Sequence, residues 1–284
     1  MRDRLAEALK VHDVDYADIR VEDLTNSWVN FRGPDLDTIG SSRTVGGIVR
    51  ALYKGGWGYA TFNDLEGLDK RVREACETAR IVGTERSQLA PVEAVQAALK
   101  ADLVKDFRAV PLAEKKALME EYNKIILGYH PSMQTSLVRY ADSFKSMWYA
   151  SSEGTYIEEE TPDVNLMVIG VAREGDNVQN GFKVGGGIDG YQSVENFHDE
   201  VRAAAKLAVD LVAAPTVTGG TYQVITDPLL TGVLTHEAFG HLSESDFIYE
   251  NERMKELMQL GKRFGADRLN ILDDGSLPGG LGTH

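Results

Sequence analysis

The strictest structural constraint in the sequence is a pair of histidines, His236 and His241, which lie five positions apart near the end of a predicted helix. An ideal α-helix turns by about 100° per residue, so residues four apart share a face, whereas residues five apart point about 140° away from each other. Both rings can reach one point only if the helix bulges by one residue or breaks between them. Gly240 lies where this distortion would fall, and glycine tolerates it best. The spacing therefore predicts a local departure from regular helix.

The helix that leads to these histidines has a clear sequence start. Asp227 can accept hydrogen bonds from free N–H groups of the first turn, and Pro228 fits the first helical position. Four apolar side chains then predict a mostly buried helix: Leu229, Leu230, Val233 and Leu234. Because imidazoles and a carboxylate at the end of a buried helix are costly unless they are used, this context favours a functional role for them.

The motif H-E-x-x-x-H is one residue longer than the H-E-x-x-H motif of zinc proteases. If the helix distorts, neutral His236 and His241 can ligate Zn²⁺ at about 2.0–2.1 Å. Glu237, next to a ligand but not itself one, would take a proton from water and pass it to the leaving amine. The motif therefore favours metal-assisted hydrolysis of a peptide bond, although a short pattern with three fixed positions also occurs by chance.

Charge and cysteine content exclude several classes of protein. With 30 Lys and Arg against 44 Asp and Glu, the net charge is −14, which argues against nucleic-acid binding. The single cysteine, Cys76, rules out an internal disulfide framework and a Cys-rich zinc module. No apolar run approaches the roughly 18–20 residues of a membrane span, and residues 1–7 carry acids where a signal peptide would be apolar. We therefore expect no membrane association and a cytoplasmic location.

The chain is predicted to alternate short strands with amphipathic helices, which is typical of an α+β fold. The predicted strands are residues 17–21, 27–31, 47–53, 133–140, 146–150, 165–171, 221–226 and 270–272. The predicted helices cover residues 65–82, 112–129 and 194–212, together with a first amphipathic helix that buries Leu5, Ala8 and Leu9. Residues 23–26 are read as a turn, and a short Ala-rich helix is expected between Pro91 and Pro111. In the helix 194–212, six residues form the predicted buried stripe: Val194, Phe197, Val201, Ala204, Ala208 and Leu211.

Pro- and Gly-containing stretches divide the chain into four parts. Residues 1–84 form a predicted N-terminal α+β domain, and residues 85–111 a linker or junction. Residues 112–215 form a central α+β domain, and residues 216–284 open a third domain that carries the motif.

These residues resemble the TldD/PmbA family of metalloproteases, also called the modulator of DNA gyrase family. The likeness is strongest over residues 227–246, with further matches at 15–20, 46–59 and 273–279, and it keeps its order along nearly the whole chain. The resemblance implies N-terminal and central α+β domains plus the start of a C-terminal domain with the HExxxH helix. It also implies zinc-dependent cleavage of unfolded or extended peptides inside a dimer cavity, with His236 and His241 as ligands and Glu237 as base.

One departure from the family concerns the third zinc ligand. In the zinc-bearing branch this ligand looks like a cysteine far downstream, whereas Cys76 matches no family ligand and is expected in a helix core beside Val72 and Ala79. The chain is therefore expected to be a truncated member with an incomplete third domain. Since catalytic zinc normally has three protein ligands, we expect this chain alone to be weakly active or inactive. Glu244 or Asp246 could serve as a substitute ligand, orient the histidines, or cap the next helix.

Other candidate sites have simpler interpretations. The glycine-rich residues 185–190 lack the Gly-Lys-Ser/Thr ending of a phosphate loop and are expected to form a turn between a strand and a helix. The acidic run 158–160 is expected at a solvated strand end rather than at a cation site. His12, His130 and His198 are expected to lie at the surface or to have their ring nitrogens hydrogen-bonded to a neighbouring group. Residues 247–261 are expected to form a core or dimer-interface helix rather than a peptide-contacting surface.

Two functions from different classes remain. The first is a zinc-dependent metallopeptidase that acts on unfolded or extended peptides as a homodimer or as a heterodimer with a relative. The second is a non-catalytic peptide-binding or scaffold subunit that pairs with an active relative and adds peptides to a sheet edge as strands. A cleavage assay with a Glu237→Gln control distinguishes the two.

Overall fold

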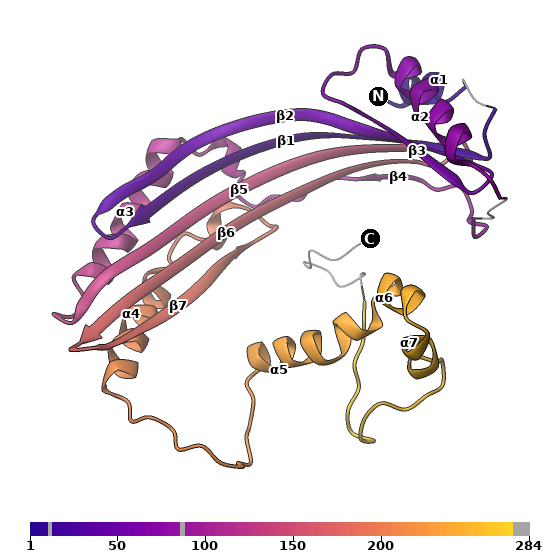
Figure 1. The fold of residues 1–284 in the computed structure, drawn as a ribbon. Coiled ribbons are helices and arrows are strands. Elements are labelled where there is room, and N and C mark those ends of the chain that lie inside the picture. Colours follow the sequence, from indigo (N-terminus) through magenta and orange to yellow (C-terminus); the bar gives the residue numbers. More distant parts are fainter. Residues whose placement is uncertain (11–12, 86–88, 275–284) are drawn as a thin grey trace. The chain divides into compact units, whose positions relative to one another are not determined.

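The computed structural model describes residues 1–10, 13–85 and 89–274, and the chain separates into two compact units, residues 1–214 and 215–284. Both units are shown in Figure 1. No helix in the described part of the chain is long and apolar enough to cross a membrane. Two sequence predictions concern residues outside the described ranges: the surface position of His12 and most of the family match at residues 273–279.

The first unit is built on one sheet of seven strands. The strands are β1 (Tyr16–Arg32), β2 (Asp35–Tyr53), β3 (Gly56–Phe62), β4 (Gln96–Leu99), β5 (Met133–Ser151), β6 (Tyr156–Glu174) and β7 (Asn177–Gly187). Their order is β3-β2-β1-β5-β6-β4, and β7 also pairs with β6. Every pairing is antiparallel except that of β4 with β6. The centre of the sheet is the β1–β5 pair, which joins the predicted N-terminal domain to the central one.

Four strands of this sheet are unusually long, because strands in globular proteins mostly have 3–10 residues. β2, β5 and β6 have 19 residues each, and β1 has 17. Tight turns join β1 to β2, β2 to β3 and β6 to β7, and Gly33, Gly55 and Gly175 occupy them with positive φ angles of 55°, 80° and 59°. Glycine adopts these angles without a steric penalty, so the chain can reverse within two residues.

Helices cover the two ends of the sheet, as Figure 1 shows. The buried residues below them form separate cores. The helices are α1 (Arg2–Ala8), α2 (Leu68–Val82), α3 (Leu112–Leu127) and α4 (His198–Ala213). At one end α1 and α2 bury Leu5, Ile19 and Val49 with their neighbours. At the other end α3 and α4 pack over Val138, Tyr140 and Leu166. The predicted helices 65–82, 112–129 and 194–212 are all present, although α4 starts later and Leu211 is exposed while Val212 is buried.

The prediction of two short strands separated by a turn at residues 23–26 was wrong. β1 runs through this polar stretch without a break, because β2 and β5 pair with every residue of it on both sides. Asp23 and Thr25 are only half-buried there, so the polar side chains keep contact with solvent. Residues 133–140 and 146–150 likewise belong to the single strand β5.

Two further segments differ from their sequence predictions. The region between Pro91 and Pro111 contains no α-helix; instead β4 joins the sheet edge beside β6, because its backbone finds hydrogen-bonding partners there. The glycine-rich residues 185–187 form the end of β7 rather than a turn. Gly186 has a φ of 123°, and a Cβ atom there would lie 1.8 Å from the carbonyl oxygen of Val164, so only glycine allows this pairing.

The contact of β3 with α2 gives a testable prediction for Gly58. A Cβ atom on this residue would lie 2.0 Å from the carbonyl oxygen of Ala75, so the helix backbone would have to move. We expect Gly58→Ala to lower the free energy of unfolding in a urea titration by about 1–3 kcal/mol. The control is Gly219→Ala, where nothing lies within 4 Å of the added atom. Equal stability of both variants would show that α2 is not packed this closely on β3.

The second unit is helical in its described part. It contains α5 (Pro228–Thr235), a π-helical turn (His236–Gly240), α6 (Ser245–Glu250) and α7 (Glu252–Leu257). Residues 221–226 and 270–272 were predicted to be strands, but neither forms one, because a strand needs a hydrogen-bonded neighbour and no strand occurs among the described residues of this unit. The predicted burial of α5 was also wrong: Leu229 is 64% exposed and Leu234 57%. Of the segment 247–261, Met254 is buried and Tyr249 is exposed.

Candidate metal centre

The helix α5 begins as its sequence predicts. The Asp227 carboxylate accepts a hydrogen bond of 2.8 Å from the backbone N–H of Leu230, and Pro228 occupies the first turn. The backbone carbonyl of Asp227 also accepts the N–H of Thr231 at 2.9 Å. These contacts fix the start of the helix and therefore its phase at residue 236.

The predicted distortion lies between the two histidines. Residues His236–Gly240 form a π-helical turn, and the backbone N–H of His241 donates to the carbonyl of His236. This i to i+5 hydrogen bond stacks residue 241 over residue 236, which a regular α-helix cannot do. Gly240 itself has φ −55° and ψ −58°, and a Cβ atom there would come no closer than 3.6 Å to the His236 ring. Glycine is therefore compatible with the turn but not required by it.

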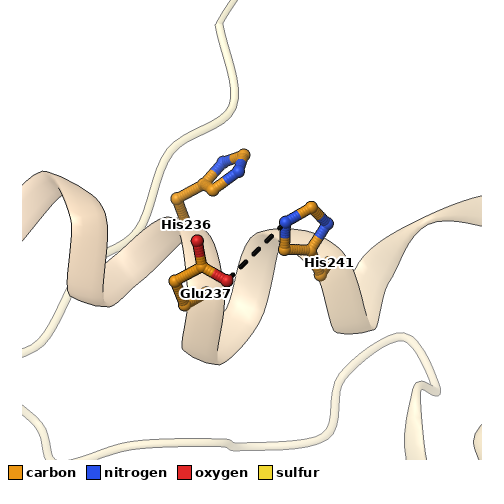
Figure 2. A group of neighbouring side chains, drawn as sticks. All are labelled: His236, Glu237 and His241. Atoms are coloured by element: carbon orange, nitrogen blue, oxygen red, sulfur yellow. Dashed lines mark ion pairs between the residues drawn. The ribbon is translucent and has the colours of Figure 1, made fainter.

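The turn brings three potential ligand side chains together, as Figure 2 shows. The two imidazole rings lie with their centroids 4.4 Å apart and their planes at 66°. One ligand atom from each of His236, Glu237 and His241 falls within 4.8 Å of the other two. The Glu237 carboxylate lies 3.8 Å from Nε2 of His241. Among the described residues, this is the one group of three or more His, Cys, Asp or Glu side chains that converges in this way.

Glu244 makes a second contact with this group. Its carboxylate lies 2.6 Å from Nδ1 of His241, which leaves Nε2 free to face Glu237. This hydrogen bond raises the pKa of His241 above its ordinary value, although partial desolvation acts in the opposite direction. Because a metal ion binds the neutral ring, the raised pKa makes metal binding at His241 more sensitive to low pH. Asp246, by contrast, accepts the N–H of Phe247 within its own helix at 2.8 Å.

The donor set fits zinc better than a hard cation. Two imidazole nitrogens and a carboxylate suit Zn²⁺, whereas Mg²⁺ and Ca²⁺ prefer oxygen ligands throughout. All three side chains are solvent-exposed, so an ion and a substrate can reach them. The described residues supply two imidazoles and no cysteine at this point, which leaves a metal ion with open coordination positions.

The two other histidines in the described part of the chain, His130 and His198, have polar partners of their own within the first unit, and Cys76 is buried there. Nδ1 of His130 lies 2.7 Å from the Ser132 hydroxyl, and Nε2 of His198 lies 2.9 Å from Glu121. Cys76 lies on α2 in the hydrophobic core and is 2% exposed, and this burial raises the pKa of its thiol. The two histidines therefore have polar partners, and Cys76 is a core residue, as their sequence context predicts.

A cavity of about 430 Å³ next to the π-helical turn was not anticipated from the sequence. Phe239 lines it from the turn, and Phe264 lines it from a segment 25 positions downstream. The two rings meet edge to face with centroids 5.5 Å apart. No local sequence signal could have indicated this contact, because residues 263–271 have no regular periodicity.

Three domain models of one protein family match this chain in order. They are the PmbA/TldA metallopeptidase domain 1 at residues 17–79, the central domain at residues 105–212 and the C-terminal domain at residues 219–284. The last of these includes the π-helical turn.

Curated relatives carry the name metalloprotease. The chain is 40% identical over 271 residues to a metalloprotease of Synechocystis, covering 95% of this chain and 58% of the relative. It is 29% identical over 285 residues to a metalloprotease of Methanocaldococcus jannaschii, which covers 95% of this chain and 60% of the relative. It is 27% identical over 264 residues to a zinc metalloprotease TldD homolog of Saccharolobus solfataricus, which covers 91% of this chain and 56% of the relative. The chain thus spans about three fifths of the length of these relatives.

Solved structures share the fold at low sequence identity. A candidate modulator of DNA gyrase from Bacteroides thetaiotaomicron matches with a TM-score of 0.69 and 16% identity, covering 85% of this chain and 56% of that one. TldE from Thermococcus kodakarensis matches with a TM-score of 0.60 and 12% identity, and the match covers 74% of this chain and 47% of that one. These matches confirm the predicted α+β fold.

Proposed function

The chain belongs to the PmbA/TldD metallopeptidase family, and on this premise we propose that its π-helical turn holds the zinc ion of a peptide-bond hydrolase. The convergence of His236, Glu237 and His241 within 4.8 Å carries this proposal. His236 and His241 are the metal ligands, and Glu237 is the general base.

Each side chain has a role that follows from its position. Bound zinc supplies Lewis-acid polarisation of the scissile carbonyl and of water. The Glu237 carboxylate accepts a proton from the attacking water as the new C–O bond forms, and it returns this proton to the leaving amine as the C–N bond breaks. Glu244 holds His241 by the 2.6 Å contact to Nδ1 and so fixes which ring nitrogen faces the metal.

The proposed substrate is an unfolded or extended peptide, and the proposed assembly is a dimer, either of two copies or with a family relative. The exposure of the three side chains supports access by a flexible chain. Because two imidazoles are fewer than the three protein ligands usual for catalytic zinc, we propose that this chain alone hydrolyses peptides slowly.

Zinc content is the direct test of the ligand assignment. Elemental analysis of the purified chain is expected to give bound zinc, and His236→Ala is expected to lose it, since the one imidazole that remains holds zinc weakly. His130→Ala is the control, because the His130 imidazole bonds to nearby Ser132 and takes no part in this site. Equal zinc in the wild type and in His236→Ala would contradict the assignment.

A second candidate function rests on the small number of imidazoles at the site. A non-catalytic subunit that binds extended peptides and pairs with an active relative needs no complete zinc site. Such a chain would bind an unfolded substrate without cleaving it, and the Glu237→Gln variant would then behave like the wild type in a cleavage assay.

A further inference from the structure

A second polar site lies in the first unit, far along the sequence from the π-helical turn. A cavity of about 480 Å³ opens where α3 begins over the middle of the sheet. The strand register places Ser41, Ser27 and Asp142 in one row across β2, β1 and β5. The next row on the same face of the sheet contains Arg43 and Thr25. The cavity therefore lies where the apolar core below α3 and α4 gives way to polar side chains.

The floor of this cavity is a buried ion pair. Nζ of Lys115 donates to the Asp142 carboxylate at 2.5 Å and to the Ser27 hydroxyl at 2.9 Å. The same carboxylate oxygen accepts the hydroxyls of Ser27 at 2.5 Å and Tyr140 at 2.6 Å. Lys115 is 3% exposed, Asp142 5% and Ser27 7%. The Ser27 hydroxyl thus both donates and accepts a hydrogen bond within this network.

Stability alone gives no strong reason for this pair. Two charges that leave water lose several kcal/mol of hydration each, and apolar residues of similar volume are often as stable in their place. A buried, hydrogen-bonded charge network that lines an open cavity is instead a candidate for a ligand site.

Two arginines complete the cavity at its rim. Arg43 is held by Asp23 through Nε at 2.9 Å and a terminal nitrogen at 2.6 Å. Arg108 is held in the same way by Asp106, and its guanidinium lies 3.6 Å from the centre of the Phe144 ring. Each guanidinium has five N–H donors, so both keep donors for a further acceptor. With Lys115, the cavity gathers three cations. Each is paired with one acid, Asp23, Asp106 or Asp142, so the cavity offers an anion the remaining N–H donors rather than a net positive charge.

The start of α3 adds backbone donors at the same place. Val110, Leu112 and Lys115 line the cavity, and no described side chain caps the first turn of this 16-residue helix. Uncapped N–H groups and the helix dipole both favour a negative charge at this end.

We propose that this cavity binds a small organic anion through its phosphoryl or carboxylate oxygens. Arg43 and Arg108 hold the charged group at the rim, and the Ser27–Lys115–Asp142 network fixes the floor. The site is independent of the proposed zinc chemistry, because it uses none of the residues of the π-helical turn.

Isothermal titration of metal-free protein with pyrophosphate, and separately with succinate, tests this proposal at constant ionic strength. We expect saturable one-site binding of at least one probe, and the stronger probe identifies the anion as phosphoryl or carboxylate. Arg43→Gln and Arg108→Gln are each expected to weaken binding by about tenfold or more, since each removes charge-assisted hydrogen bonds. Both variants leave the buried pair intact.

The matched control is Arg20→Gln. Arg20 lies on β1 and pairs with Glu22 in an exposed ion pair, as Arg43 pairs with Asp23, but it does not line this cavity. Its binding constant is expected to stay within about twofold of the wild type. Glu237→Gln is also expected to bind normally, which separates this site from the zinc site. Absence of binding by both probes, or equal weakening by Arg20→Gln, would overturn the proposal.

Discussion

Replacing Glu237 with glutamine is expected to lower the rate of peptide hydrolysis by about 10²–10⁴-fold, the usual contribution of a general base. Glutamine has the same shape as glutamate but accepts no proton from water at neutral pH. The Glu237 carboxylate is exposed and lies 3.8 Å from Nε2 of His241, so its replacement leaves both imidazoles in place. Zinc per chain is therefore expected to stay unchanged while turnover is lost.

The rate is measured per bound zinc on an unfolded protein substrate, at high concentrations of the chain and with long incubation. Glu252→Gln is the control, since Glu252 is an exposed glutamate of α7 that pairs with Lys255. Equal rates in the wild type and in Glu237→Gln would refute the hydrolase proposal. Loss of zinc together with activity would mean that Glu237 is a ligand rather than the base.

The second large effect is expected in the first unit, at Asp142. Asp142→Ala leaves the ammonium group of Lys115 buried without its counter-ion, with the Ser27 hydroxyl as its remaining hydrogen-bond partner, at 2.9 Å. Removing one partner of a buried ion pair typically lowers stability by about 3–5 kcal/mol. We expect a loss of this size in the free energy of unfolding, measured by urea titration.

The double variant Lys115→Met with Asp142→Leu separates charge from packing. It removes both charges and keeps a similar volume, but it also leaves the buried Ser27 and Tyr140 hydroxyls without their acceptor. Its loss of stability is therefore expected to be smaller than that of Asp142→Ala but not zero. If the single variant lost less than about 1 kcal/mol, the ammonium group would be reached by water and the floor of the cavity would not be buried.

The geometry of the candidate metal site was largely predictable because it depends on local rules. The start of α5 at Asp227 and Pro228 follows from helix capping. The π-helical turn follows from the requirement that residues 236 and 241 meet. The role of Glu244 stayed open at the sequence level, because its contact with His241 depends on where the chain turns after the helix.

The strand lengths were not predictable from local patterns. Residues 23–26 look like a turn in isolation, yet they are held in β1 by pairing with β2 and with β5, and β5 lies more than 100 positions away. β4 likewise depends on β6 for its hydrogen bonds. In both cases tertiary pairing overrides the local preference.

The same limit applies to the buried network around Lys115. Its members come from β1, α3 and β5, and none of them belongs to a recognisable motif. Only the register of the sheet brings Ser27 and Asp142 side by side.

The central β1–β5 pair also determines when this sheet can be completed during synthesis. Its paired residues lie between 105 positions apart (Arg32 and Leu137) and 133 positions apart (Asp18 and Ser151). At ribosomal speeds of about 5–20 residues per second, β1 waits roughly 5–25 s for its partner. During that interval the hairpin of β1 and β2 presents a long hydrogen-bonding edge to other nascent chains, so the protein is most exposed to misassociation before residue 151 has emerged.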